Sequence, residues 1–126
     1  MRYDLLYLAA GALLAVYLRY FITGDNLFVG DLPVSVLIIN IAGSFILGAT
    51  STAVSELGLS SDYTLFVGIG FCGTLTTMST FALETVNMAG VGEYATAGLS
   101  ILLNVGGSFG AIILGRAVVT LLIGLG

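Results

Sequence analysis

The sequence predicts an all-α integral membrane protein with four transmembrane helices. Of its 126 residues, 58% are hydrophobic and only 8% are charged, and the mean hydropathy is +1.13. A soluble domain carries about 25% charged residues, so this chain has too few charges to cover a surface in water. Disorder would require low hydrophobicity, and the single cysteine excludes a disulfide scaffold or a cysteine-ligated metal cluster. A membrane environment is therefore expected.

Polar residues divide the chain into four apolar segments, each close to the ~20 residues that a helix needs to cross the hydrocarbon core. The predicted helices cover about 5–23, 34–54, 64–88 and 95–122. The first ends at the turn 24–26, the second follows Pro33 as a favourable first helical residue, and the third follows the polar run 60–62. The connections are too short to fold on their own. We therefore predict a single membrane domain over 1–126.

Three arginines provide little to fix the orientation of this domain. Arg2 and Arg116 fall near one face of the predicted bundle and Arg19 near the other, and the chain has no lysine. The positive-inside rule therefore has little to act on. Insertion in both directions would permit an antiparallel dimer; alternatively, two arginines against one suffice to fix a single orientation.

Two of the predicted helices carry polar stripes with a four-residue spacing, which places each stripe on one helix face. The stripes are Asn40, Ser44 and Gly48 in the second helix, and Ser100, Asn104 and Ser108 in the fourth, where Gly106 and Gly110 also form a GxxxG pattern. Small residues allow close helix packing and asparagine can bond across helices, so a structural role explains each stripe alone. Two stripes that each contain an asparagine equally indicate a hydrated or ion-conducting path.

The third predicted helix contains a hydroxyl-rich stretch, GTLTTMST, over 73–80. Threonine and glycine are mediocre helix formers, and non-helical backbone at membrane depth requires burial in protein or a cavity. We therefore predict a helix that is broken in mid-membrane, with free carbonyls suited to a cation and free amides suited to an anion. Glu84 is expected in the first turn of the second half, either as a functional carboxylate or as compensation for the helix dipole.

Several motifs resemble the Fluc (CrcB-type) fluoride channel family. The segment GFCGTLTTMSTF over 70–81, followed by Glu84, resembles the family's GFxGGxTTFSTF…E, and NIAGSFILG over 40–48 resembles its NxxGSFxxG. The first helix, from Gly11 to Arg19-Tyr20, is similar to GGxxGAxxRY, and Asn104-Val105 with Ser108 gives a looser match in the fourth helix. The resemblance covers nearly the whole chain.

This resemblance implies a passive, fluoride-selective channel that exports cytosolic fluoride across the inner cell membrane. It implies an antiparallel, dual-topology homodimer with two pores along the subunit interface. A structural sodium ion at the centre of that dimer would be bound by backbone carbonyls of Gly73 and Thr76 from both subunits.

The resemblance also implies which residues form the fluoride pathway. Those residues are Asn40 as an amide donor, Ser79 and Thr80 as hydroxyl donors, Phe81 as a pore ring, and Asn104 and Ser108 as pore-facing polar groups. An aromatic ring has a positive edge that it can present to an anion. Arg19 would make the vestibule electropositive, or it is simply a snorkelling interfacial side chain.

Met78 also belongs to this implied fluoride pathway and is the main departure from the family, because it stands where the family has its first pore phenylalanine. Methionine is polarisable but lacks the ring quadrupole. Three consequences stay open: conduction at a changed rate, pairing with a homologous second subunit in a heterodimeric channel, or loss of function. Thr74 in place of a family glycine is a milder change.

Other function classes have weaker support. The chain has no histidine, the commonest general base and metal ligand, so we expect no enzyme, and we expect no nucleic-acid partner. A small four-helix proton-coupled exporter is the alternative, and it would need an intramembrane carboxylate. Glu84 is the only one, because the first helix has only Asp4 at its edge. A non-conducting structural subunit is a third possibility.

Overall fold

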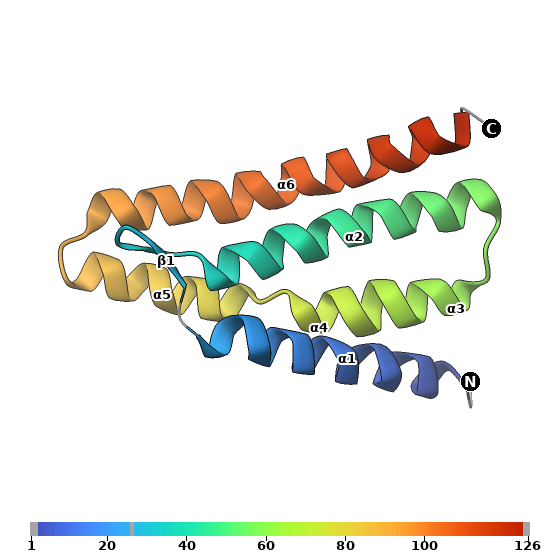
Figure 1. Ribbon diagram of the computed structural model, residues 1–126, viewed down its shortest axis with the longest axis horizontal. Coiled ribbons are helices and arrows are strands. Elements are labelled where there is room, and N and C mark those ends of the chain that lie inside the picture. The colour runs from blue at the N-terminus through green and yellow to red at the C-terminus, as the bar shows by residue number, and fades with distance from the viewer. Residues whose placement is uncertain (1–2, 26, 125–126) are drawn as a thin grey trace.

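The computed structural model describes residues 3–25 and 27–124 as a bundle of long helices (Figure 1). Its elements are α1 (Asp4–Gly24), β1 (Phe28–Val29), β2 (Leu32–Pro33), α2 (Ser35–Leu57), α3 (Ser61–Tyr63), the π-helix η1 (Thr64–Cys72), α4 (Gly73–Leu75), α5 (Met78–Gly90) and α6 (Tyr94–Gly124). Four helical segments are long and apolar enough to cross a membrane: α1, α2, the composite Ser61–Gly90, and α6. The chain is therefore a multi-pass membrane protein. α1 begins and α6 ends at the same end of the bundle.

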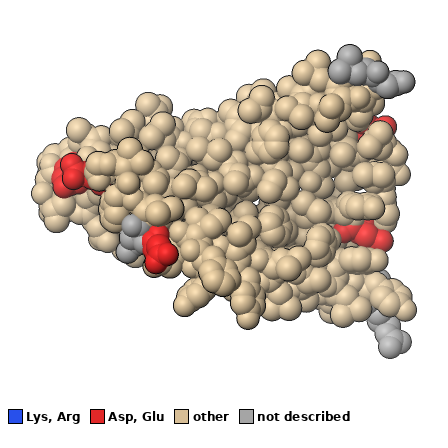
Figure 2. All heavy atoms as spheres, viewed as in Figure 1, with Lys and Arg blue, Asp and Glu red and all other residues tan. Residues whose placement is uncertain are grey.

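Acidic side chains lie at the two ends of the bundle, and the surface between them is uncharged on the face that Figure 2 shows. Large apolar side chains such as Leu13, Leu102 and Ile113 are more than half exposed along this middle zone. Such a surface is unfavourable in water and favourable against lipid or another apolar protein surface. The distribution fits four membrane spans with hydrated connections.

The backbones of α2 and α6 touch where glycines remove the side chain. A Cβ on Gly48 would overlap the carbonyl oxygen of Ile112, and a Cβ on Gly115 would overlap that of Phe45. The GxxxG pair behaves differently, since a Cβ on Gly106 or Gly110 would meet no atom of another described segment within 4 Å. The close approach expected from the GxxxG pattern therefore does not occur within the chain, where other glycines provide it.

The third span combines several backbone geometries. In η1 the hydrogen bonds span five residues, as in the bond from the Gly73 N–H to the Gly68 carbonyl. Helical geometry then stops for two residues, because Thr76 (φ −74°, ψ 150°) and Thr77 (φ −147°, ψ 114°) are extended, and α5 begins at Met78.

This interruption is shorter than the stretch 73–80 expected from composition. The Thr76 N–H still donates to the Cys72 carbonyl at 3.1 Å, which keeps residues 73–75 helical, and the Thr77 hydroxyl starts α5 immediately afterwards. The prediction that Glu84 lies in the first turn of the second half is therefore wrong, because Glu84 is the seventh residue of α5 and lies at the end of its second turn.

The connection before α2 forms a small β-hairpin that the sequence analysis does not anticipate. Phe28 pairs with Pro33 and Val29 with Leu32, and the turn between them contains Gly30 at φ +61°. Pro33 therefore ends a strand and does not start a helix, and α2 begins at Ser35. Its hydroxyl accepts a hydrogen bond from the Leu27 N–H at 3.0 Å, which ties the hairpin to the start of α2.

Candidate functional site

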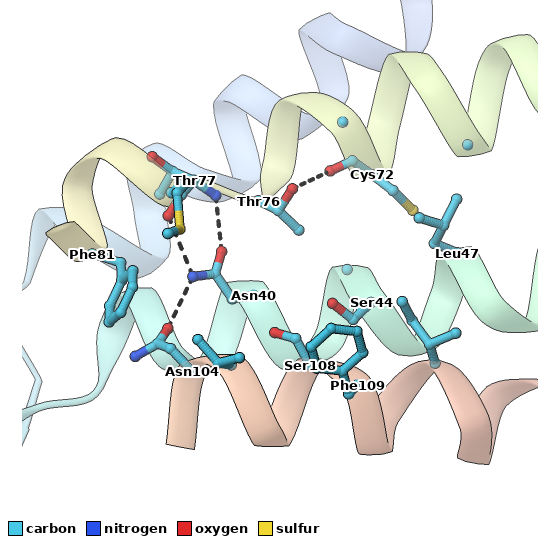
Figure 3. A pocket seen from close by; sticks show the side chains of 16 residues that line it. Asn40, Ser44, Leu47, Cys72, Thr76, Thr77, Phe81, Asn104, Ser108 and Phe109 are labelled. Atoms are coloured by element: carbon cyan, nitrogen blue, oxygen red, sulfur yellow. Dashed lines mark hydrogen bonds between the residues drawn. The ribbon is translucent and has the colours of Figure 1, made fainter. Parts of the chain in front are cut away.

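A cleft of about 330 Å³ lies between α2, α6 and the α4–α5 junction (Figure 3). None of the 16 described residues that line it is charged. Its polar lining consists of Asn40, Ser44, Thr76, Thr77, Asn104 and Ser108. Met78 and Phe109 lie at its rim and are 70% and 67% exposed. The cleft therefore offers amide and hydroxyl groups inside an apolar surface that is open on one side of the chain.

The Asn40 side chain is bound to the backbone of Thr77 on both sides of its amide. Its Oδ1 accepts from the Thr77 N–H at 2.8 Å, and its Nδ2 donates to the Thr77 carbonyl at 3.3 Å. The same Nδ2 also donates to Oδ1 of Asn104 at 2.9 Å. A primary amide has two N–H donors. Both donors of Asn40 are therefore occupied within the chain.

Asn104 continues this arrangement along α6, because its Nδ2 donates to the Ser100 carbonyl at 3.1 Å. One N–H of Asn104 is left without a partner among the described residues. The hydroxyls of Ser44 and Ser108 likewise form no hydrogen bond within residues 3–25 and 27–124. These three groups provide free hydrogen-bond donors on side chains of the cleft.

Thr77 is the N-cap of α5, a role that the sequence analysis does not assign. Its hydroxyl accepts from the Thr80 N–H at 3.3 Å and lies 3.1 Å from the Thr80 hydroxyl and 3.3 Å from that of Ser79. Ser79 and Thr80 are exposed and lie outside the cleft lining. A threonine directly before a helix is a common N-cap signal. The sequence has several threonines in this stretch, so the signal alone does not show which of them precedes the helix.

Phe81 lies against the cleft from the first turns of α5 and is only 5% exposed (Figure 3). Met78 lines the same cleft from the rim, three residues earlier on the same helix. The structure therefore brings together the methionine and the phenylalanine that the sequence analysis places on one pathway. Both residues line the same cleft as Asn40 and Asn104.

Gly73, the first residue of α4, and Thr76, which directly follows α4, both line the cleft. Within the described part of the chain, no group donates a hydrogen bond to the carbonyl of either residue. The carbonyl ends of a helix carry partial negative charge. No group of three or more His, Cys, Asp or Glu side chains that could hold a metal occurs among the described residues. The carbonyl oxygens of Gly73 and Thr76 therefore keep free acceptor capacity within the part of the chain that the structure describes.

Arg19 and Glu84 lie outside the cleft lining. Both side chains are partly buried, Arg19 on α1 and Glu84 on α5, and neither forms an ion pair with a residue that the structure describes. The structure therefore does not bring these two predicted residues into the cleft that contains the amides of Asn40 and Asn104.

A second cavity of about 270 Å³ adjoins the cleft, and both are lined by Leu47 and Gly68. Its remaining lining is rich in hydroxyl groups: Thr50, Ser51, Ser55 and Thr64. None of these residues is singled out by the sequence analysis, because single hydroxyl residues near helix ends give no distinctive pattern. The polar lining therefore continues past Leu47 towards the end of α2.

The family described as CrcB-like protein, Camphor Resistance (CrcB), matches residues 6–116 of this chain. The chain belongs to the CrcB-like protein family. It is 42% identical over 120 residues to the fluoride-specific ion channel FluC of Nitrosopumilus maritimus, with 95% of each chain covered.

Two further CrcB-like relatives also bear the name fluoride-specific ion channel FluC. The protein of Methanococcus maripaludis is 40% identical over 113 residues, which cover 90% of this chain and 93% of the relative. That of Acinetobacter baylyi is 36% identical over 113 residues, which cover 89% and 90%. These names describe ion channels and not enzymes. The predicted relationship to the Fluc (CrcB-type) family is confirmed.

Proposed function

We propose that this chain is a passive fluoride channel that lets cytosolic fluoride leave the cell. The observation that carries the proposal is the uncharged cleft, which combines free hydrogen-bond donors with an apolar frame. Its relatives in the CrcB-like family are named fluoride-specific ion channels, which supports the same ion. Hydrogen fluoride enters cells as a neutral acid and ionises at cytosolic pH, so a passive exit in the inner membrane would protect the cell.

The donors of the cleft suit a small anion that must pass through and not remain bound. Removing water from an ion in a low-dielectric medium costs tens of kcal/mol, so the path must supply hydrogen bonds at each step. The free N–H of Asn104 and the hydroxyls of Ser44 and Ser108 can provide them, and the edge of the Phe81 ring adds partial positive charge. Because the described residues that line the cleft include no lysine or arginine, no fixed cation among them would trap the ion.

A second copy of the chain would complete the path. The cleft is open on one side, and its rim residues Met78 and Phe109 are largely exposed. The outward-facing Gly106 and Gly110 on α6 offer a surface on which another helix could pack closely. With only three arginines, the chain has little bias in its insertion. We therefore propose an antiparallel homodimer with two equivalent pores along the interface.

Sodium would fit at the centre of such a dimer. The carbonyls of Gly73 and Thr76 have no internal donor, and carbonyl oxygen is a suitable ligand for a hard cation. Two carbonyls from one chain are too few for a cage, whereas two copies would contribute four. A bound sodium ion would add positive charge near the amide site and link the two subunits.

The direct test is ion efflux from liposomes that contain only this polypeptide. Fluoride and chloride release are recorded with ion-selective electrodes under the same potassium gradient with valinomycin. We expect rapid fluoride release and chloride release no faster than from empty liposomes. Equal release of both ions would refute selectivity, and release of neither would refute conduction by this chain alone. In the second case, restored release with a homologous subunit would favour the heterodimeric alternative.

Glu84 distinguishes the channel from a proton-coupled exporter. It is partly buried on α5 but lies outside the cleft. We expect Glu84→Gln to change fluoride efflux only in rate, with no dependence on an imposed proton gradient before or after the substitution. Transport that is driven by a proton gradient and lost in Glu84→Gln would establish the carrier in place of the channel.

A further inference from the structure

We propose that Asn40 and Asn104 form a positioning relay that fixes the backbone of the Thr76-Thr77 interruption, so that Asn40 acts on the ion path through Thr77. In this assignment the ion meets the remaining N–H of Asn104 and not the amide of Asn40. The role in ion passage rests on the proposed function, whereas the relay itself rests on the hydrogen bonds of the structure.

The side chain of Asn40 pairs with the backbone of Thr77. Helical geometry stops at this residue, so its N–H and carbonyl lose their regular partners. The Asn40 amide supplies both replacements, at 2.8 Å and 3.3 Å, as the backbone of a neighbouring strand would (Figure 3). An unpaired buried backbone group costs about 1–3 kcal/mol. The pairing therefore stabilises an otherwise unfavourable backbone.

The Thr77 N–H determines the orientation of both asparagine amides in the relay. A backbone N–H can only donate, so the Thr77 N–H forces Oδ1 of Asn40 to face it and turns Nδ2 towards the Thr77 carbonyl and Asn104. Asn104 must then present its Oδ1 to Asn40, which leaves its Nδ2 for the Ser100 carbonyl. The orientation of the Asn40 amide thus sets that of the Asn104 amide, although the two residues are 64 positions apart in the sequence.

The side chains that form the relay are buried. Asn40 is 8% exposed, Asn104 is 6% exposed and Ser100 is 1% exposed, so water does not readily replace these bonds. Asn40 uses both of its N–H groups inside the chain, whereas Asn104 retains one. An anion could contact Asn40 only by displacing Thr77 or Asn104, but it could contact Asn104 without breaking the relay.

Hydrogen exchange of the Thr77 amide, measured by NMR on the protein in detergent micelles, tests the relay without any transport assay. We expect Asn40→Leu to accelerate this exchange about tenfold or more, because the acceptor is removed. Asn104→Leu, which does not touch Thr77, should accelerate it severalfold by releasing one of the bonds that hold Asn40. Ser108→Ala, one turn further along the same face of α6, is the matched control and should leave the exchange rate of the Thr77 amide unchanged.

The isosteric variant Asn104→Asp retains an acceptor for Asn40 and should keep the Thr77 amide protected. The buried amide of Ile39 in α2 reports global folding in every variant. If Asn104→Leu accelerates both amides, the variant has lost its fold, and Asn104→Asp alone decides: retained Thr77 protection supports the relay. Exchange of Thr77 that is equal in Asn104→Leu and Ser108→Ala, with Ile39 protected, would overturn it, as would loss of Thr77 protection in Asn104→Asp with Ile39 protected.

Fluoride efflux separates the relay from the proposed function. Thr77 protection that depends on Asn104 in a chain that conducts no fluoride would leave the relay intact and refute the channel. Fluoride-selective efflux with Thr77 exchange independent of Asn104 would do the reverse. With both intact, we expect Asn104→Leu and Asn104→Asp to lower efflux alike, because both lose the free N–H, while only the first releases Thr77.

Discussion

Met78 is the cleft residue whose chemistry changes most from the family motif. Its thioether lies at the rim, close to where the ring of Phe81 faces the cleft. We expect Met78→Phe to raise fluoride efflux severalfold, because a second ring edge adds partial positive charge along the path. The measurement is the initial rate of efflux from liposomes at equal protein density.

Leu83→Phe is the control for this substitution, since Leu83 lies on the same helix, is 61% exposed and does not line the cleft. It should leave the rate unchanged. Equal rates for Met78→Phe and the unsubstituted chain would show that the methionine position contributes no ion contact.

The Thr77 hydroxyl is expected to stabilise α5 as its N-cap. Thr77→Ala removes the acceptor for the Thr80 N–H and should cost about 1 kcal/mol in the free energy of unfolding. Thr77→Ser keeps the hydroxyl and should be close to the original stability. The midpoint of thermal unfolding in detergent reports both, and identical midpoints for the two variants would rule out the cap.

The polar residues of the site could be predicted individually, but their mutual contacts could not. The four-residue spacing placed Asn40 and Asn104 on helix faces, and the cleft lining contains both. Spacing within one helix carries no information about which side chain of another helix it meets, so the bond between them required the structure. Ser79 and Thr80 were expected on the ion path, but they do not line the cleft. A hydroxyl-rich composition does not show which hydroxyls point into a cavity.

Among the elements, the α2–α6 pair depends on glycine. Gly48→Ala and Gly115→Ala would each place a methyl group onto a carbonyl of the facing helix and should cost about 1–3 kcal/mol by forcing the helices apart. Gly98→Ala is the control and should not destabilise the protein, because its Cβ would meet no atom of another described segment within 4 Å. Equal unfolding midpoints for all three variants would contradict the close backbone contact.

The four long spans could be predicted from hydropathy because length and apolar composition suffice for a membrane helix. The internal geometry of the third span could not. No residue pattern distinguishes η1 from an α-helix, and the sequence does not show that Gly70 of η1 lies against the Leu8 carbonyl of α1. The hairpin at Gly30 was likewise hidden, since two-residue strands leave no period to detect.

At the scale of the whole molecule, the balance of positive charge between its two ends determines the orientation in which it inserts into the membrane. Leu59→Lys with Ser61→Lys adds two lysines at the end where α1 begins, and Asp31→Lys with Val91→Lys adds two at the other end; all four residues are exposed. Each double variant should insert in one orientation only and lose efflux when produced alone. Producing both together should restore efflux by forming the antiparallel pair.

The neutral double variant Leu59→Gln with Ser61→Gln controls for the loss of the original side chains and should conduct alone. Full efflux from either lysine variant on its own would refute the antiparallel arrangement. Protease accessibility of the two connections in intact vesicles verifies the orientation in each case.

The start of α1 and the end of α6 lie at one end of the bundle, which limits how such a pair could become a single polypeptide. In antiparallel subunits, the end of α6 in one copy and the start of α1 in the other would lie on opposite sides of the bilayer. A gene that joins two copies in tandem would therefore need one additional hydrophobic crossing between them, and a short polar linker would instead force the second half into the wrong orientation.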